Sequence, residues 1–143
     1  MSFHRLSFSG LLPKQKGYST ELKTVGDHIR RKRMDEELTL SEVGGIIGVN
    51  NNTLTSWSLH DVYPMIRHFP GIIKYLGYAP LFFDDGSLSS QMEHYRRVNG
   101  LSYKKLSKLI GCDEARLKRL GNKHRIFQQS IDKIEQFLKG VSH

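Results

Sequence analysis

The sequence predicts an all-α protein built from two tandem domains of about four short helices each. Two observations support this prediction. When the chain of 143 residues is shifted by 63 positions, the segment LTLSEVGGIIGVNNNTLTSW lies over LSYKKLSKLIGCDEARLKRL. The positions that agree are apolar residues and one glycine, which is typical of a duplicated fold. Within each copy, apolar residues recur three and four positions apart, which is the period of an amphipathic helix.

The agreement between the copies extends beyond these segments. At the offset of 63, the matched pairs are Ile29 with Met92, Arg33 with Arg96, Leu38 with Leu101, Val43 with Leu106, Ile47 with Ile110, Gly48 with Gly111, Leu54 with Leu117 and Trp57 with Leu120. Downstream the offset becomes 62, and the pairs are Phe69 with Ile131, Ile72 with Ile134, Tyr75 with Phe137 and Leu76 with Leu138. Chance agreement with a single one-residue gap explains this pattern poorly.

Each copy is expected to form four helices. In the first copy they are expected near 24–36, 40–47, 51–60 and 66–76, and in the second near 88–98, 102–110, 113–121 and 128–138. The corresponding domains are 24–77 and 88–143, joined by a linker at 78–87 and preceded by a basic segment at 1–23 that we expect to be flexible.

Capping residues precede the expected helices. Thr39 and Ser102 stand before the second helix of each copy, and Asn50 and Asp113 before the third. A short polar side chain at this position accepts a hydrogen bond from a free amide of the first turn. Gly77 is expected to end the first copy.

The linker is too apolar for a free tether. Its residues Leu81, Phe82 and Phe83 are expected to pack between the copies, and a turn is expected at Asp84–Gly86.

The spacing around Gly48 predicts two helices that cross steeply at a tight turn. A small residue, Gly44, comes four positions before it, and the apolar residues Leu54 and Trp57 follow six and nine positions after it. The small residue lets the helices approach, and the turn glycine adopts a positive φ without a Cβ clash. The same pattern in the second copy is formed by Ser107, Gly111, Leu117 and Leu120. Because the apolar residues anchor the third helix by its back, its front projects outward, as in a helix-turn-helix.

At these residues the chain resembles a known family. The segment TVGDHIRRKRMDEELTLSEVGGIIGVNNNTLTSW is similar to the Cro/C1-type (lambda-repressor-like) helix-turn-helix proteins of bacteria and phages. The resemblance covers roughly 24–77, with a weaker second match over 88–138. The chain departs from the family at Leu40 and Tyr103, where the family usually has glutamine.

The resemblance implies which residues read bases in the major groove of DNA. The candidates are Asn51, Asn52 and Ser56 in the first copy and Glu114, Ala115 and Arg119 in the second. Their chemistry suits this role, since Asn pairs with adenine, Arg with guanine and Glu with cytosine, while Ala touches a thymine methyl group. The simpler alternative is that these polar residues only solvate a helix.

Charge favours a polyanionic partner, with nucleic acid ahead of a membrane. The formal net charge is +8, and residues 87–143 hold twelve Lys and Arg against five Asp and Glu. Residues 35–86 hold two basic and seven acidic residues. The candidates for phosphate contacts are Lys104, Lys105, Arg116, Lys118, Lys123, His124 and Arg125. A solvated basic face is the alternative for this group. The leading Arg5, Lys14, Lys16 and Lys23 form either a minor-groove arm or a merely basic segment.

Other chemistry has little support in the sequence. The seven histidines and the single cysteine show no spacing typical of a zinc site, so no metal is expected. Cys112 is expected to be a core residue, and a reducing cytoplasm is the expected compartment.

No apolar run approaches the length of a membrane span, and no secretory signal is recognised. No phosphate-binding loop or pair of catalytic acids is present, so we expect neither an enzyme nor a cofactor or small-molecule ligand.

These expectations converge on sequence-specific binding of double-stranded DNA by a cytoplasmic, nucleoid-associated transcriptional regulator. Helices near 51–60 and 113–121 would enter the major groove. Two alternatives stay open. One is the DNA-targeting component of a recombination or transposition system. The other is an antitoxin-like or adaptor module whose first copy no longer binds DNA. The sequence leaves open whether the chain forms a homodimer and whether it represses or activates.

Overall fold

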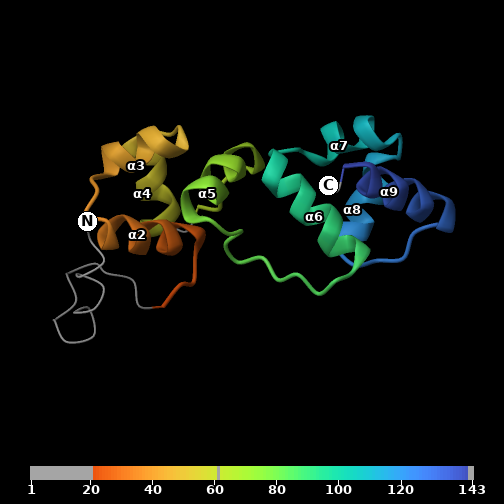
Figure 1. Cartoon of the computed structure of the whole chain (residues 1–143), viewed down its shortest axis with the longest axis horizontal. Helices are drawn as coiled ribbons and strands as arrows, with labels where there is room; N and C mark the ends of the chain where they lie inside the picture. Colours follow the sequence, from red (N-terminus) through yellow and green to blue (C-terminus); the bar gives the residue numbers. More distant parts are fainter. Residues whose placement is uncertain (1–20, 61, 142–143) are drawn as a thin grey trace. The chain divides into compact units, whose positions relative to one another are not determined.

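The computed structural model describes residues 21–60 and 62–141, and it confirms the all-α fold (Figure 1). No strand is present within these two ranges. The α-helices, with one short 3-10 helix η1, are α2 (Val25–Asp35), α3 (Leu40–Ile47), α4 (Asn51–Leu59), η1 (Ile66–His68), α5 (Phe69–Leu76), α6 (Leu88–Asn99), α7 (Tyr103–Ile110), α8 (Glu114–Gly121) and α9 (Gln128–Val141). The expected helices are all present, and the one expected near 66–76 is divided into η1 and α5.

The contacts of the chain divide it into two compact units. Unit 1 contains the described residues up to Pro64 together with Gly71–Leu81, and unit 2 contains Met65–Pro70 and the described residues from Phe82 onward. This division differs from the expected domain limits because it assigns η1 and the start of α5 to unit 2. A Cβ atom on Gly100 would lie 2.9 Å from Pro70 Cγ, so this segment packs closely on the end of α6.

The repeat is visible in the positions of the helices. Helices α2, α3 and α4 start at Val25, Leu40 and Asn51, and their counterparts α6, α7 and α8 each start 63 residues later. The residue before each of these six helices accepts a hydrogen bond from a backbone amide of the first turn, at Thr24, Thr39, Asn50, Ser87, Ser102 and Asp113. The four caps expected from the sequence are therefore confirmed.

One side-chain hydrogen bond is repeated as well. The guanidinium of Arg33 donates to the carbonyl oxygen of Leu38 at 3.0 Å, and that of Arg96 donates to the carbonyl oxygen of Leu101 at 3.0 Å. In both units this bond ties the last turn of the first helix to the loop that leads into the second. The similarity between the two units therefore includes this polar contact.

Each unit has its own apolar core. In unit 1, Val43, Leu54 and Trp57 are buried, and Ile29 of α2 is buried with them. The core of unit 2 is formed by Met92, Leu106, Cys112, Leu117, Ile134 and Leu138. The expectation that Cys112 is a core residue is confirmed.

The turns between the second and third helices are built by glycine. Gly48 and Gly111 have φ values of 95° and 80°, which L side chains rarely adopt. The amide of Gly48 donates to the carbonyl oxygen of Gly44 at 2.7 Å, and that of Gly111 donates to the carbonyl oxygen of Ser107 at 2.8 Å. In unit 1 the backbone comes so close that a Cβ on Gly44 would lie 2.5 Å from Val49 O.

Two apolar residues of the linker are exposed, Leu81 at 49% and Phe83 at 83%. Packing of the linker between the copies stays a prediction. Phe82 lies inside unit 2, where its ring is 5.6 Å from that of His94. Directly after it, the Asp84 carboxylate accepts a hydrogen bond from the Gly86 amide at 2.9 Å, which confirms the expected turn.

The adjacent glycines of α3 allow a matched test of the turn. Gly44→Ala should lower the free energy of unfolding by more than about 1 kcal/mol, because the new Cβ meets a backbone oxygen that cannot rotate away. Gly45→Ala should raise it by about 0.5–1 kcal/mol, since nothing lies within 4 Å of its Cβ and alanine is the better helix former. Chemical denaturation of both variants measures the difference. Equal effects would refute a tight turn at Gly44.

Candidate nucleic-acid interface

Helix α8 presents an exposed cationic face. Leu117 is fully buried and anchors the helix in the core of unit 2. The exposed positions on the other side are Ala115, Arg116, Lys118 and Arg119. Glu114 is half-buried at the first turn. The sequence pattern therefore placed two phosphate candidates, Arg116 and Lys118, and two base-reading candidates, Ala115 and Arg119, on the solvent side of this helix.

The cations of α8 make only surface contacts. Lys118 lies 3.3 Å from the carboxylate of Glu114, Arg119 donates to the carbonyl oxygen of Arg125 at 3.1 Å, and the guanidinium of Arg116 lies 5.4 Å from the ring centre of Phe127. Exposed ion pairs contribute little to stability and exchange readily for other partners. These side chains are thus oriented by their neighbours and remain accessible to a ligand.

Helix α7 adds a second group of cations. Lys104 and Lys105 in its first turn and Lys108 in its last turn are exposed. Their aliphatic neighbour Leu109 is also exposed, while Leu106 is fully buried in the core. The helix therefore presents its basic side to solvent beside α8, which it contacts.

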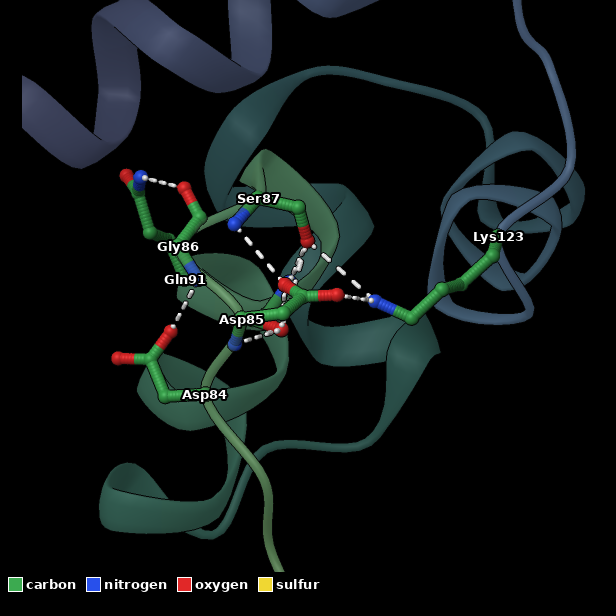
Figure 2. A network of polar contacts seen from close by, with 7 residues as sticks. Asp84, Asp85, Gly86, Ser87, Gln91 and Lys123 are labelled. Carbon is green, nitrogen blue, oxygen red and sulfur yellow. Dashed lines mark hydrogen bonds and ion pairs between the residues drawn. The ribbon is translucent and has the colours of Figure 1, made fainter.

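Lys123 has a protein partner that the sequence did not suggest. Its ammonium lies 2.8 Å from the Asp85 carboxylate and 3.3 Å from the Ser87 hydroxyl, at the start of α6 (Figure 2). The two residues are 38 positions apart, so no local pattern signals the pair. Lys123 also has a φ of 63°, which ends α8. The side chain of Lys123 is 57% exposed despite this ion pair, and His124 and Arg125 are exposed as well.

Asp85 is the centre of this network. It accepts hydrogen bonds from the Ser87 amide at 2.9 Å and from the Ser90 hydroxyl at 2.7 Å (Figure 2). The hydrogen bond from Lys123, followed by those from Ser87 and Ser90, lowers the pKa of Asp85 below its usual 3.8. A lowered carboxylate pKa stabilises the folded state above the unfolded pKa, and this contribution disappears as the pH falls below it.

A buried polar cluster supports α7 and α8 from behind, and sequence reasoning did not find it. The hydroxyl of Tyr103 donates to Glu93 at 2.7 Å, and Glu93 is paired with Arg96 at 3.2 Å. The guanidinium of Arg96 stacks on the Tyr103 ring at 3.9 Å. Burial, followed by the hydrogen bond to Glu93, raises the pKa of Tyr103 to about 12. The signals in the sequence are the spacing of Glu93 and Arg96, three positions apart on one helix, and a tyrosine where the Cro/C1-type proteins usually have glutamine.

In unit 1 the surface of α4, which corresponds to α8, is polar but uncharged. Asn51 and Asn52 at the start of α4 are exposed, and the Asn51 amide donates to the Ser41 hydroxyl at 3.2 Å. Ser56 is half-buried, and its hydroxyl donates to the carbonyl oxygen of Thr53 at 2.8 Å. The sequence of α4, NNTLTSWSL, contains no charged residue. Unit 1 therefore has amide groups that can face a base edge, without the cations found on α7 and α8.

The remaining expectations concern residues at or beyond the described ranges. Arg5, Lys14 and Lys16 lie outside the described residues, and Lys23 lies 3.2 Å from Glu21. Within residues 21–60 and 62–141, no group of three His, Cys, Asp or Glu side chains is placed to hold a metal ion. None of the described helices has the length and apolar character needed to cross a membrane.

Comparison with known proteins adds no relative: no family model, curated protein or solved structure matches this chain. The resemblance to the Cro/C1-type proteins therefore rests on the residues of the chain and remains a prediction.

The polar cluster behind α8 has a direct test at Gly121. Gly121→Ala should lower the free energy of unfolding by roughly 1–3 kcal/mol, because its Cβ would overlap the Tyr103 hydroxyl and lie 2.9 Å from Glu93 Oε2. Adding Tyr103→Phe removes the overlapping oxygen, so the double variant should lose less free energy of unfolding than the sum of the losses of the two single variants. Thermal and chemical unfolding of all three variants measure this coupling free energy. Simple additivity would mean that the tyrosine does not fill this space.

Proposed function

We propose that this chain binds double-stranded DNA through unit 2, with α8 in the major groove and α7 beside the phosphate backbone. The observation that carries the proposal is the joint exposure of Arg116, Lys118 and Arg119 on a helix anchored by a fully buried leucine. The major groove admits one α-helix, and cations on both sides of it can neutralise phosphates.

Base reading in unit 2 is assigned to the outward residues at the two ends of α8. Arg119 has the fork geometry that pairs with guanine, and Ala115 offers a methyl group that suits thymine. Glu114 would accept from cytosine after leaving Lys118. Phosphate contacts are assigned to Lys104, Lys105, Arg116, Lys118, His124 and Arg125. Lys123 is included as well, since its ion pair with Asp85 is as exposed as the pair of Lys118 with Glu114.

Unit 1 supplies a second reading helix in this proposal. Asn51 and Asn52 are exposed at the start of α4, where amide groups can pair with adenine. The two units then read different half-sites, because one presents amides and the other presents arginines. A regulator of transcription is the role that best fits such a protein. The absence of charge on α4 is the observation that favours the second candidate for unit 1, an interaction module without DNA contact.

Removal of the α8 cations tests the proposal through the salt dependence of binding. The combined change of Arg116, Lys118 and Arg119 to alanine should nearly abolish binding of a duplex at moderate salt. The slope of log affinity against log salt should also become shallower by about one unit for each phosphate that is no longer neutralised. Fluorescence anisotropy with a labelled duplex measures both quantities.

The control for this variant removes the same charge elsewhere. Arg67, Lys74 and Lys139 are exposed and lie outside α7 and α8. Changing these three to alanine should leave the salt slope nearly unaltered. If the control weakens binding as much as the α8 variant does, net charge and not the α8 surface determines affinity.

Substitutions of Asn50 and Asn52 distinguish a structural role from base reading in unit 1. The Asn50 side chain accepts a hydrogen bond from the Thr53 amide at 2.8 Å, so Asn50→Ala should lower the free energy of unfolding by about 1 kcal/mol. Asn52→Ala should leave stability unchanged but relax base preference, at a cost of about 1–3 kcal/mol for the preferred base pair. Denaturation and binding selection from random duplexes measure the two effects. Full discrimination by the Asn52 variant would favour the interaction-module alternative for unit 1.

A further inference from the structure

Unit 1 contains a small cavity that is lined mainly by apolar groups and includes two arginines. A space of about 80 Å³ lies among α2, α4 and the first residue of α3. Its lining residues are Gly26, Ile29, Arg30, Arg33, Leu40, Leu54, Thr55, Ser58 and Leu59. The polar groups among them are two guanidinium groups and two hydroxyl groups, and no Asp or Glu is included. One water needs at least about 10–15 Å³ of such volume, so this space is large enough for a small ligand.

The repeat shows what occupies the equivalent place in unit 2. At the offset of 63, Arg33 corresponds to Arg96, Arg30 to Glu93, Leu40 to Tyr103 and Ser58 to Gly121. In unit 2 these positions form a polar cluster, in which the Tyr103 hydroxyl donates to the Glu93 carboxylate at 2.7 Å and the carboxylate pairs with Arg96 at 3.2 Å. Gly121 is required there because a Cβ would overlap the Tyr103 hydroxyl.

At the position of the acidic Glu93 of unit 2, unit 1 has a second basic residue, Arg30. Arg33 keeps the hydrogen bond to the Leu38 carbonyl that its counterpart makes in unit 2. Arg30 stands where the carboxylate stood, is half-buried, and has no hydrogen-bond or ion-pair partner among the described residues. The smaller Leu40 leaves the space of the tyrosine ring empty. The hydroxyl of Ser58 makes only a long contact, 3.5 Å from the carbonyl oxygen of Thr55.

We propose that this cavity binds a small oxyanion, a carboxylate or a phosphate, which takes the place of the Glu93 carboxylate of unit 2. Two guanidinium groups offer paired N–H donors that match the geometry of such an anion, and the hydroxyls of Thr55 and Ser58 add further donors. The ligand is a free anion or the terminal group of a small molecule. The site is independent of DNA binding by α8, since none of its residues belongs to unit 2.

The test is a titration of the full chain with inorganic phosphate at constant ionic strength, followed by NMR of backbone amides. Saturable shifts are expected around Arg30, Arg33 and Ser58, with acetate moving the same amides. Arg30→Gln should weaken binding roughly tenfold or more, the usual value of a lost charge-assisted hydrogen bond. Arg31→Gln removes the same charge from the next residue, which does not line the cavity, and should leave binding unchanged.

A second variant transfers the filled arrangement of unit 2 into unit 1. The combined changes Arg30→Glu, Leu40→Tyr and Ser58→Gly provide the carboxylate, the ring and the space for its hydroxyl. This variant should have a higher melting temperature than the wild type in phosphate-free buffer, and phosphate should no longer raise it.

Three results would overturn the proposal. One is the absence of saturable shifts in the wild type, and another is equal weakening by Arg30→Gln and Arg31→Gln. The third is a triple variant whose melting temperature is still raised by phosphate, because the transferred carboxylate would then not occupy the anion site. Each result leaves the α8 surface of unit 2 to be judged by its own salt dependence.

Discussion

The left-handed glycine turn between the second and third helices is the constraint on which each unit depends. A positive φ at Gly48 and at Gly111 turns the chain directly after the second helix, so that the third helix starts at Asn51 and at Glu114. This arrangement buries Leu54 and Leu117 at equivalent positions. The opposite side of the third helix is consequently left in solvent. A side chain at either glycine would have to adopt a conformation that costs about 1–2 kcal/mol.

The same scaffold presents two different surfaces. Its shared parts are the six helix caps, the two glycine turns and the arginine that donates to the loop after the first helix. What differs lies on the surface of the third helix and behind it. Unit 2 has exposed cations on α7 and α8 with a polar cluster behind them, whereas unit 1 has exposed amides with a cavity behind them that includes two arginines. The exposed residues of the third helix can therefore differ between the units while the caps, the glycine turns and this arginine stay the same.

Most of the fold follows from local patterns and could be predicted. Helix starts depend on a cap such as Thr39, turns depend on a glycine such as Gly48, and buried faces depend on apolar spacing, all within a few residues of one another. The candidate residues on α8 were placed correctly for the same reason, since one buried leucine orients the whole helix. The repeat supported the same prediction independently, because a weak pattern that occurs twice at a constant offset arises by chance less often than one that occurs once.

The contacts that could not be predicted join residues far apart in the sequence. The pair of Lys123 with Asp85 spans 38 positions and depends on how the end of α8 meets the start of α6. Phe83 is exposed although its side chain is apolar. An apolar side chain is buried only where another part of the protein packs against it. The cavity beside Arg30 required both the structure and the comparison of the two units. Neither alone indicates that a carboxylate is missing.

The central claim is that unit 2 binds duplex DNA through α7 and α8. The most direct measurement is an NMR titration of the labelled chain with an arbitrary duplex at low salt and without phosphate buffer, conditions under which electrostatic binding does not require the preferred sequence. If unit 2 binds the duplex in this way, the largest amide shifts fall on residues 103–119 and disappear as salt is added. Shifts concentrated on α9, or no shifts in unit 2, would contradict this claim.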